Sequence, residues 1–342
     1  MKLLVSSLEP SANLHLEALL KKMDTEIVGI FDERFGTPLY SSREFSVMGF
    51  WDVLPKIFKA KEAIKELVFL AQEADSILLI DAPSFNLPLA KAIKEKYPDK
   101  KITYYILPKV WAWKKGRVKK VEKYCDNLAS IFPFENKFYN RSTYVGNPLL
   151  DEISLVKDPN IHYGMTSFMP GSRKSEIKKL MPIFREIAKE IEGDKVIIVP
   201  PFLKGEDLTE LYGNIDDFNI SYIMQETLAH SDFAFICSGT ATLEAAIIGV
   251  PFVLAYKAKP FDYKIAKFFI KLPHAGLANL ILDFEGLAPL HQEFLQEEVT
   301  KENLLNAYKN FDKNHFSNAA KTLKTLLKSG STQNIIDLLA KE

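Results

Sequence analysis

The sequence has few of the residues and runs that mark an oxidising or membrane-spanning environment. Only two of its 342 residues are cysteines, Cys125 and Cys237, and they support neither a disulfide framework nor a metal site. No uncharged apolar run reaches the roughly 20 residues that cross a bilayer, and residues 1–5 are too short for the apolar core of a signal peptide. We therefore expect a protein of the reducing cytoplasm whose membrane contact, if any, is peripheral.

Net charge and recognisable metal or nucleophile motifs are lacking too. Lys plus Arg and Asp plus Glu both number 44, so no overall field recruits nucleic acid, and anion binding depends on a local patch. The six histidines show no HExxH spacing, and Asp216 and Asp217 are adjacent rather than separated as in a DxD metal clamp. Neither a G-x-S-x-G turn nor a phosphate loop ending in Gly-Lys-Ser/Thr occurs. We expect no metal, no cofactor and no nucleic-acid partner.

The sequence does contain a regular alternation of short apolar runs with helix-prone segments. This alternation predicts an α/β fold, with parallel sheets covered by helices on both faces. It stops at 151–164, where Asp158-Pro159-Asn160 and Gly164 indicate a linker, and then restarts. Because 342 residues exceed one typical core, we predict two doubly wound, Rossmann-like domains. The expected strands are 3–6, 26–31, 76–80, 101–106, 127–132, 143–146, 166–169, 195–199, 219–223, 231–237 and 251–256.

The stretch 231–256 is predicted to form a strand, a turn of small residues, a helix and a second strand. A strand that enters a helix through Ser238-Gly239-Thr240 places backbone N–H groups and a helix N-terminus at one point, which favours a phosphate. Glu244, about one turn into the helix, could then reach a ribose hydroxyl. A purely structural βαβ turn explains this stretch alone equally well.

A second turn of this kind, Pro170-Gly171-Ser172-Arg173, follows the strand at 166–169. The glycine admits a phosphate close to the backbone, and Arg173 offers charge-assisted hydrogen bonds worth about 1.5–3 kcal/mol. Many helices begin after Pro-Gly-Ser, so the motif gains meaning only beside Ser238–Thr240. Because both turns follow strands of one parallel sheet, they lie at its carboxyl edge, where ligands bind.

Two carboxylates follow strands in the N-terminal half. Glu9 comes after the first strand, and Asp81 comes directly after the strand at 76–80. A carboxylate at the edge that faces an interdomain cleft could act as a general base, typically worth about 10²–10⁴ in rate. The alternative is a turn carboxylate that binds its own backbone before Pro83. The pattern alone slightly favours the turn at Asp81 and favours it more strongly at Glu9.

Two segments combine apolar and basic residues. The helix expected over 51–72 places Phe50, Leu54 and Phe58 near one face with lysines elsewhere, and 109–123 holds seven Lys or Arg against one Glu, beside two tryptophans. Basic residues beside exposed aromatic rings suit the interface of an anionic membrane. A core-packed helix and buried tryptophans are the alternatives. The residues assigned to this membrane or acyl-chain surface are Phe50, Trp51, Leu54, Phe58, Trp111 and Trp113.

Several of these segments, in this order, resemble the lipid-A-disaccharide synthase family. The resemblance runs over most of the chain, and the motifs at 80–86 and 110–113 are the most specific to the family. In sequence order the matching residues are Val47-Met48-Gly49, Ile80-Asp81-Ala82-Pro83-Ser84-Phe85-Asn86, Val110-Trp111-Ala112-Trp113 with Arg117, Phe132-Pro133-Phe134-Glu135, Pro170-Gly171-Ser172-Arg173, Ser238-Gly239-Thr240-Ala241-Thr242-Leu243-Glu244, Lys259-Pro260, Asn279 and Gln296-Glu297-Glu298.

The resemblance implies a two-domain GT-B glycosyltransferase. Such an enzyme moves 2,3-diacylglucosamine from UDP to 2,3-diacylglucosamine 1-phosphate, inverts the anomeric centre without a metal, and releases UDP. Asp81 becomes the favoured general base, with Glu9 beside it. The implied UDP contacts are Arg173, Ser238, Gly239, Thr240, Glu244 and Asn279, with Gln296 and Glu297 added.

The resemblance also implies an organisation and a location for the chain. Residues 1–155 would form an acceptor domain facing the membrane, 156–312 a UDP-sugar-binding domain, and 313–342 C-terminal helices packing back on the first domain. The implied location is the cytoplasmic face of the bacterial inner membrane, against an anionic surface. A homodimer stays open.

Three positions depart from the family pattern. The first loop, 8–13, keeps Glu9 and Ser11 but lacks the usual glycines and Asp, Asn147 replaces a histidine, and Ala278 replaces a proline. Two other functions stay open, of which the altered loop bears on the second. One is a UDP-sugar epimerase of GT-B-like fold, which would not need the apolar basic surface. The other is a non-catalytic protein that binds a UDP-lipid.

Overall fold

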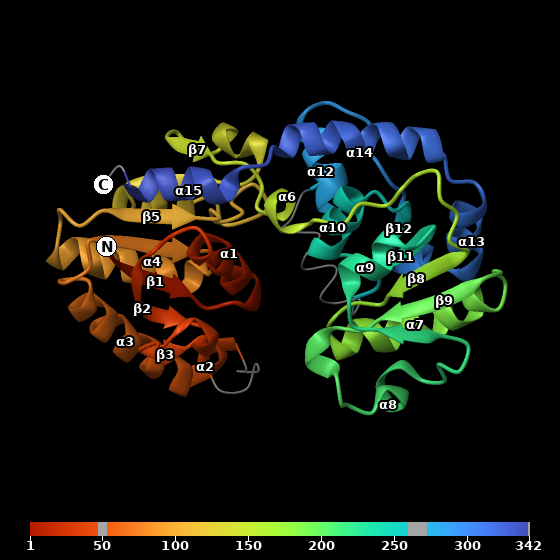
Figure 1. The fold of residues 1–342 in the computed structure, drawn as a ribbon, viewed down its shortest axis with the longest axis horizontal. Coiled ribbons are helices and arrows are strands. Elements are labelled where there is room, and N and C mark those ends of the chain that lie inside the picture. The colour runs from red at the N-terminus through yellow and green to blue at the C-terminus, as the bar shows by residue number, and fades with distance from the viewer. Residues whose placement is uncertain (47–52, 259–271, 341–342) are drawn as a thin grey trace. The chain divides into compact units, whose positions relative to one another are not determined.

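A computed structural model gives the structure of the chain and describes residues 1–46, 53–258 and 272–340. The side chains of residues 46 and 53–57 are not described. Phe50, Trp51, the motif at 47–49 and Lys259-Pro260 therefore lie outside the described residues, and so does the side chain of Leu54. The chain forms two compact units, Met1–Glu152 with Leu327–Glu342, and Ile153–Leu326 (Figure 1).

The first unit is built on a seven-stranded sheet in the order β3-β2-β1-β4-β5-β6-β7, and every neighbouring pair is parallel. Its central strands are buried on both faces; all five residues of SILLI in β4, for example, are buried. Such continuous apolar strands are typical of parallel sheets covered by helices. The strands are β1 (Lys2–Ser7), β2 (Glu26–Phe31), β3 (Tyr40–Ser41), β4 (Ser76–Ile80), β5 (Ile102–Tyr105), β6 (Asn127–Ser130) and β7 (Ser142–Tyr144).

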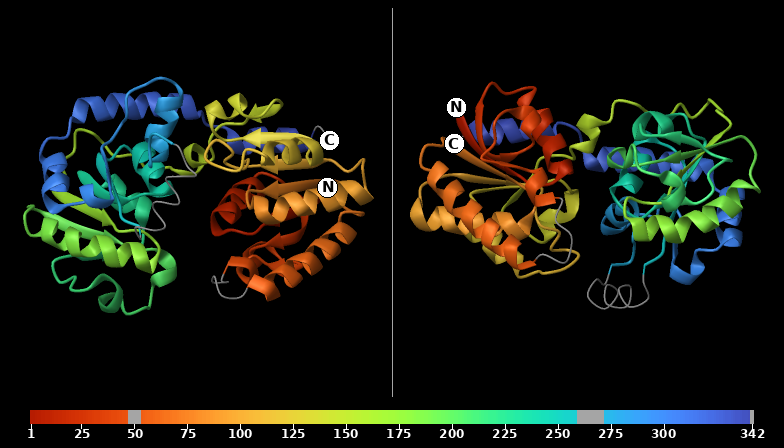
Figure 2. Two further views of the ribbon diagram at one scale, coloured as in Figure 1. Left: turned by 180° about the vertical axis from the view of Figure 1, so that it is seen from behind. Right: turned by 90° about the horizontal axis from the view of Figure 1, so that it is seen from below.

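Helices cover both faces of this sheet (Figure 2). The helices α1 (Pro10–Leu20) and α15 (Ser331–Ala340) pack together on one face, and α3 (Val53–Leu70), α4 (Pro83–Lys96) and α5 (Arg117–Tyr124) pack side by side on the other. The Asp151 carboxylate accepts hydrogen bonds from the N–H groups of Gly330 (2.7 Å) and Thr332 (2.9 Å), which caps the N-terminus of α15. The remaining helical segments are η1 (Glu33–Phe35), α2 (Arg43–Ser46), η2 (Pro133–Lys137) and α6 (Leu149–Glu152).

The second unit repeats this plan with a six-stranded sheet in the order β10-β9-β8-β11-β12-β13, again parallel throughout. Its core contains stacked aromatic rings, such as Phe168 on Phe235 with centroids 5.1 Å apart. The strands are β8 (Met165–Met169), β9 (Asp194–Ile198), β10 (Asn219–Ser221), β11 (Phe233–Cys237), β12 (Phe252–Tyr256) and β13 (Glu293–Leu295). The helices are α7 (Lys174–Ala188), α8 (Leu208–Tyr212), α9 (Met224–Ala229), α10 (Thr240–Ile248), α12 (Leu277–Phe284), α13 (Lys301–Lys309) and α14 (Lys313–Leu327), with η3 (Pro201–Leu203) and η4 (Gln296–Glu298).

The two parallel α/β sheets confirm the predicted fold class, and the differences are local. Helices α1 and α4 begin at Pro10 and Pro83, because proline is tolerated in the first helical turn, where its missing N–H would have no acceptor within the helix. The edge strands β3 and β13 have two and three residues and were not predicted, since so short a run carries no periodicity. Of the stretch 313–342, α15 belongs to the first unit and α14 to the second.

Among the described residues, no helix combines the length and the apolar composition that crossing a membrane requires.

Candidate active site

Three neighbouring strands of the first sheet end in chemically useful side chains. Glu9 follows β1, Asp81 follows β4 directly, and Lys109 lies just after β5. Ser7 at the end of β1 is paired in register with Ile80 at the end of β4, so the residues that follow them share one edge. The hydroxyl of Ser7 is buried there without a hydrogen-bond partner in the described chain. The structure thus brings together the two carboxylates that the sequence proposed.

The backbone at Asp81 is strained and firmly held. Asp81 has φ 50° and Ala82 has φ 42°, both in the left-handed region that non-glycine residues rarely occupy, at a cost of about 1–3 kcal/mol each. The N–H of Asp81 donates to the Tyr105 carbonyl (2.9 Å), and the Asp81 carbonyl accepts from the Tyr104 hydroxyl (2.6 Å). These bonds fix the direction in which the carboxylate leaves the strand.

Asn86 completes this support from inside helix α4. Its fully buried amide donates to the carbonyls of Asp81 (2.8 Å) and Ile80 (3.2 Å), while its oxygen accepts from the Ser6 hydroxyl (2.6 Å). The last residue of the 80–86 motif is therefore a positioning residue. The sequence placed Asn86 inside the motif but gave no sign of this role, because its partners are backbone atoms of a turn.

Neighbouring charges act on both carboxylates. Burial raises the pKa of Asp81 above its ordinary value, and this outweighs the opposing effects of Lys109, the Ala82 N–H, His15 and Arg117. Burial and the Asp81 charge also raise the pKa of Glu9, while Lys109 lowers it. Asp81 is therefore a better proton acceptor than an exposed aspartate, with cations at hand to keep it ionised.

A basic pocket of about 860 Å³ adjoins Asp81. Arg117 lies 3.4 Å from the Ser84 hydroxyl, and the Trp113 ring has the Lys114 ammonium 4.2 Å and the Arg117 guanidinium 5.4 Å from its centroid. No acidic residue of the described chain lines this pocket. The lining residues are Pro83, Ser84, Leu87, Pro88, Lys91, Lys114, Gly116, Arg117, Lys120 and Tyr124.

Trp111 and Trp113 have different environments. Trp113 is 47% exposed, but Trp111 is only 7% exposed and packs edge-on against Phe132 and Phe134. Its indole N–H donates to the carboxyl of Glu135 (3.3 Å), which is itself fully enclosed and whose burial raises its pKa to about 7. The expectation that both tryptophans face a membrane is corrected: Trp111 is a core residue, which was the alternative interpretation.

The exposed face of α3 is apolar but less basic than expected. Phe58 is 70% and Phe69 is 64% exposed, and eleven residues apart they lie on nearly the same side of the helix. Lys59, however, is paired with Glu44 at 2.6 Å. This face therefore presents aromatic rings with fewer uncompensated lysines than the sequence suggested.

In the second unit, the two predicted phosphate turns follow the neighbouring strands β8 and β11. Ser238 is anchored by its hydroxyl to the Ala275 carbonyl (3.1 Å), and Gly239 and Thr240 are exposed at the start of α10. No side chain caps that N-terminus. Its first N–H groups have no acceptor within the helix, so they are available to an anion.

The turn before α7 is organised by Glu176. Its carboxylate accepts from the Arg173 backbone N–H (3.3 Å) and guanidinium (2.8 Å), while the Arg173 side chain stays 76% exposed. Gly171 has φ +107°, and a Cβ there would lie 2.6 Å from the Glu176 oxygen, so glycine is required. Glu176 thus orients Arg173 without burying it, a role that the sequence did not reveal.

The other predicted UDP contacts differ in accessibility. Glu244 is partly exposed one turn into α10, and Glu297 is exposed, whereas Gln296 is buried with its amide against the backbone of Ala258. Asn279 is 1% exposed, and its amide contacts Glu293 (2.8 Å), the His291 carbonyl (2.9 Å) and the Leu290 N–H (2.7 Å). The amide of Asn279 is therefore occupied by hydrogen bonds that hold the loop before β13.

Glu293 was not predicted from the sequence as a site residue. Its carboxylate has a structural role like that of Asn279, which it contacts. It accepts from the N–H groups of Ala275 (2.7 Å) and Gly276 (3.1 Å) and so fills the N-terminus of α12. In the first unit, Asn147 stands where the family pattern has a histidine, and its buried amide donates to the Ile131 carbonyl (3.2 Å). Both side chains thus form hydrogen bonds within their own units.

The described residues contain no cluster of three or more His, Cys, Asp or Glu side chains that could hold a metal ion.

Comparisons with known proteins identify one family by sequence and one shared fold by structure. The family model described as lipid-A-disaccharide synthetase matches residues 3–338. The lipid-A-disaccharide synthase of Campylobacter jejuni (strain RM1221) is 50% identical over 359 aligned positions, covering 98% of each chain. Among solved structures, Acinetobacter baumannii MurG is similar with TM-score 0.62 at 14% identity, covering 100% of this chain and 99% of that one. The UDP-GlcNAc 2-epimerase of Neisseria meningitidis reaches TM-score 0.62 at 11% identity, covering 100% of both chains. At such identities the two structures show a shared fold alone.

Proposed function

The chain belongs to the lipid-A-disaccharide synthase family, and on that premise we propose how its two sheet edges divide the reaction. The enzyme is a glycosyltransferase that moves 2,3-diacylglucosamine from UDP to the 6-hydroxyl of 2,3-diacylglucosamine 1-phosphate. The hydroxyl oxygen forms a bond to the anomeric carbon, the bond to UDP breaks, and the hydroxyl proton must go to a base. The protein therefore has to supply a base, a site for the departing diphosphate and a site for the acceptor.

Asp81 is the base in this proposal. The observation that carries it is the rigid setting of Asp81: left-handed backbone, its carbonyl held by Tyr104 and Asn86, and a raised pKa beside Lys109. A raised pKa increases the driving force for taking a proton, and a fixed direction lowers the cost of reaching the acceptor hydroxyl. The strain that this setting stores is typical of functional sites.

Glu9 takes a second, supporting role. It lies close enough for the Asp81 charge to raise its pKa, and both carboxylates share Lys109. We assign to Glu9 a hydrogen bond to the acceptor sugar, which orients the hydroxyl that Asp81 deprotonates.

The N-terminus of α10 and Arg173 receive the diphosphate of UDP. Uncapped amides at Gly239 and Thr240 and an exposed guanidinium, oriented by Glu176, neutralise charge that grows as UDP departs. Glu244, one turn along α10, is then placed for the ribose. Gln296 and Asn279 support this region from within the fold, and Glu297 stays a proposed contact.

The basic pocket beside Asp81 binds the 1-phosphate of the acceptor. Lys91, Lys114, Arg117 and Lys120 line this cavity, and none of its described lining residues is acidic. Arg117 and Ser84 also connect the cavity to the turn that carries Asp81. A phosphate bears close to two negative charges and three acceptor oxygens, which suits such a cluster.

The side chains of Phe58 and Phe69 on α3, and of Trp113, are exposed and provide apolar surface that suits the acyl chains and a membrane. Aromatic rings beside lysines lie well at the boundary between headgroups and hydrocarbon. We propose peripheral binding to the cytoplasmic face of the inner membrane through this surface.

One incubation tests the function as a whole. The chain is mixed with both acylated substrates, without added metal, and UDP release and disaccharide formation are followed together. Equal amounts of the two products are expected. An altered UDP-sugar without disaccharide would instead mean an epimerase, and substrate binding without any turnover would mean a binding protein.

A further inference from the structure

The second unit has another cavity, of about 470 Å³, at the amino edge of its sheet. Phe233 at the start of β11 and Pro251 just before β12 line it, together with the end of α10 at Ile248 and the linker that leads into β8. The proposed diphosphate turn follows the other end of β11, about 17 Å away for a five-residue strand. The two sites are therefore separate, and the cavity has no part in the proposed transfer reaction.

The floor of the cavity is apolar. Phe233 is buried there, with the rings of Tyr308 and Phe311 at 5.1 and 5.2 Å from its own. The linker adds two exposed apolar side chains, Val156 (58%) and Ile161 (46%). A volume of about 470 Å³ falls within the range of about 300–1,000 Å³ common for small-molecule sites.

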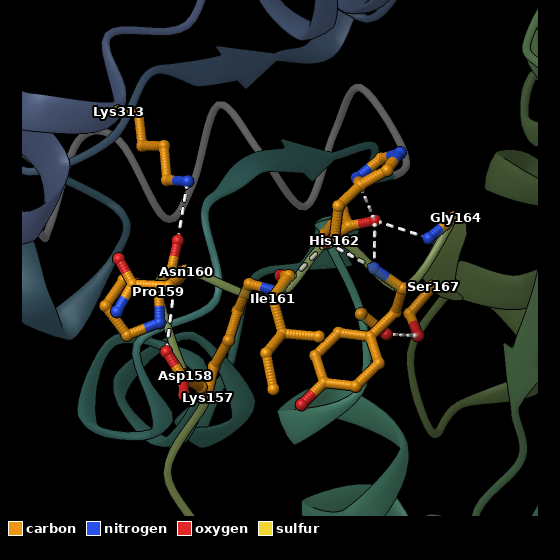
Figure 3. Close-up of polar contacts among 12 residues, drawn as sticks. Lys157, Asp158, Pro159, Asn160, Ile161, His162, Gly164, Ser167 and Lys313 are labelled. Carbon is orange, nitrogen blue, oxygen red and sulfur yellow. Dashed lines mark hydrogen bonds and ion pairs between the residues drawn. The ribbon is translucent and has the colours of Figure 1, made fainter.

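The linker wall is held in place by many polar contacts. Figure 3 shows Lys313 reaching the linker, where its ammonium donates to the Pro159 carbonyl at 2.6 Å. Asp158 accepts from the Asn160 N–H (2.9 Å), which closes a turn, and the Lys157 N–H donates to the Ile248 carbonyl (2.9 Å). The cavity is thus a built feature of the unit and not a gap beside a loose loop.

The only acidic residue that lines the cavity within the described chain is already neutralised. Asp232 pairs with Lys157 (2.9 Å) and His162 (2.7 Å) and accepts from the Gly164 N–H (2.7 Å). Burial alone would raise the pKa of Asp232, but these partners lower it overall. Asp232 therefore cannot compensate further cations.

Four other lysines face the same cavity. Lys309 ends α13, and Lys313, Lys321 and Lys324 lie along one face of α14. Lys309, Lys321 and Lys324 form no ion pair with any described residue, and partial burial lowers the pKa of Lys324. Lysine stems pack along apolar surface while the ammonium groups stay at the rim, so the cavity combines an apolar floor with an uncompensated positive rim.

From this charge complementarity we propose that the cavity binds an anionic amphiphile: a single alkyl or acyl chain that carries a phosphate. The chain lies against Phe233 and Ile161, and the phosphate lies among Lys309, Lys321 and Lys324. A phosphate fits the rim better than a carboxylate, because it offers three acceptor oxygens and nearly two charges to several lysines. The concave shape takes one chain from solution rather than the surface of a bilayer.

Titration calorimetry of the full chain with dodecyl phosphate, below its micelle concentration and with UDP saturating, tests the proposal. One molecule is expected to bind at this cavity. Lys321→Glu with Lys324→Glu should weaken binding about tenfold or more, since each charged hydrogen bond is worth about 1.5–3 kcal/mol. Lys189→Glu with Lys204→Glu, the same charge change elsewhere on the second unit, should leave it unchanged. Equal loss in both double variants, or no loss in either, overturns the proposal.

Two further ligands and two further variants separate the chemistries. Inorganic phosphate and dodecanol should each bind far more weakly than dodecyl phosphate, and equal binding of either would overturn the amphiphile. Retained UDP affinity shows that Lys321→Glu with Lys324→Glu is folded; should it not be, Ile161→Asp on the exposed linker is the second variant, with the same expected loss. Because the proposed acceptor site also takes a phosphate with acyl chains, Lys114→Glu with Lys120→Glu is included, and binding that this variant abolishes would place the ligand there instead.

Discussion

The turn after β4 and the turn after β11 stand at equivalent edges of two similar sheets, but they are built in opposite ways. At Asp81 the backbone is left-handed, and its carbonyl is taken by Tyr104 and Asn86. At Ser238 the turn is small and exposed, and the helix that follows has no side-chain cap. In the first turn, hydrogen bonds to the backbone fix the direction of one carboxylate. In the second turn, the N–H groups at the start of α10 have no side-chain cap and can bind a ligand. In the proposed reaction, the two turns would thus provide a base and an anion site within one type of fold.

The same contrast recurs within the second unit. The helices α7 and α12 have their N-termini occupied by carboxylates of the chain itself, Glu176 and Glu293. Among these three helices only α10 is left open. The sequence motifs marked the turns before both α7 and α10 as phosphate sites, but before α7 the Arg173 N–H is already bound to Glu176. A helix N-terminus therefore signals a ligand only where the chain has not filled it already.

Replacing the base should separate the two turns most sharply. Asp81→Asn keeps the shape of the side chain and removes its ability to take a proton, so kcat should fall about 10²- to 10⁴-fold while the affinity for UDP stays unchanged. Steady-state kinetics and UDP titration measure the two effects. Asp99→Asn, an exposed carboxylate of the same unit, serves as the control. Near-normal turnover in Asp81→Asn would sink the assignment of the base.

Arg173→Ala tests the other turn. Loss of its charged hydrogen bonds to the diphosphate should weaken UDP binding by about 10- to 100-fold, for about 1.5–3 kcal/mol. Lys178→Ala, an exposed cation on the same helix, should bind UDP normally. An unchanged dissociation constant in Arg173→Ala would remove Arg173 from the phosphate site.

The third prediction tests whether the basic pocket of the first unit binds the phosphate of the acceptor, as proposed. Lys114→Ala with Lys120→Ala should raise the KM for the acceptor about tenfold, with little effect on the KM for the UDP-sugar. Lys115→Ala with Lys119→Ala is matched in charge and segment but lies outside the pocket lining. If both pairs raise the KM equally, general charge and not this pocket attracts the acceptor.

Exposed aromatic residues on α3 provide the test of membrane binding. Phe58→Ser with Phe69→Ser should lower sedimentation with vesicles rich in phosphatidylglycerol several-fold, because each ring loses apolar area that the bilayer would cover. Phe202→Ser with Ile223→Ser removes equally exposed apolar side chains from the second unit. Identical losses in both pairs would show that this surface is not special.

The smallest effect concerns the core beneath the first site. With the pKa of Glu135 raised to about 7, the folded chain holds a proton that the unfolded chain has released above its ordinary pKa of 4.5. The free energy of unfolding should therefore fall as the pH rises through this window, and Glu135→Gln should flatten that dependence. Chemical denaturation at several pH values measures it, with the exposed Glu95→Gln as control. An equally steep decline in Glu135→Gln would assign the dependence to other groups.

Much of the fold could be predicted because its strands are short, apolar and buried on both faces. The strands at 26–31 and 76–80 end where the pattern ends, as β2 and β4 do. The edge strands β3 and β13 were not predicted, because strands of two or three residues bury too little apolar surface to require a hydrophobic pattern in the sequence. The burial of Trp111 was also not predicted. It depends on packing against Phe132 and Phe134, which lie about 20 residues later in the chain.

By itself, the sequence determined the alternation of strands and helices, the order of the motifs and the types of side chain at each strand end. Those properties are local, since they depend on hydrophobic spacing and on which residues follow a strand. Only the tertiary structure decided which of these groups are free to act. It bound Asn279 and Gln296 into the fold, directed Asn86 and Tyr104 onto the backbone of Asp81, and left the Ser238–Thr240 turn open. A hydrogen-bonding group can serve a substrate only if no partner inside the protein has claimed it, and such partners come from distant parts of the chain.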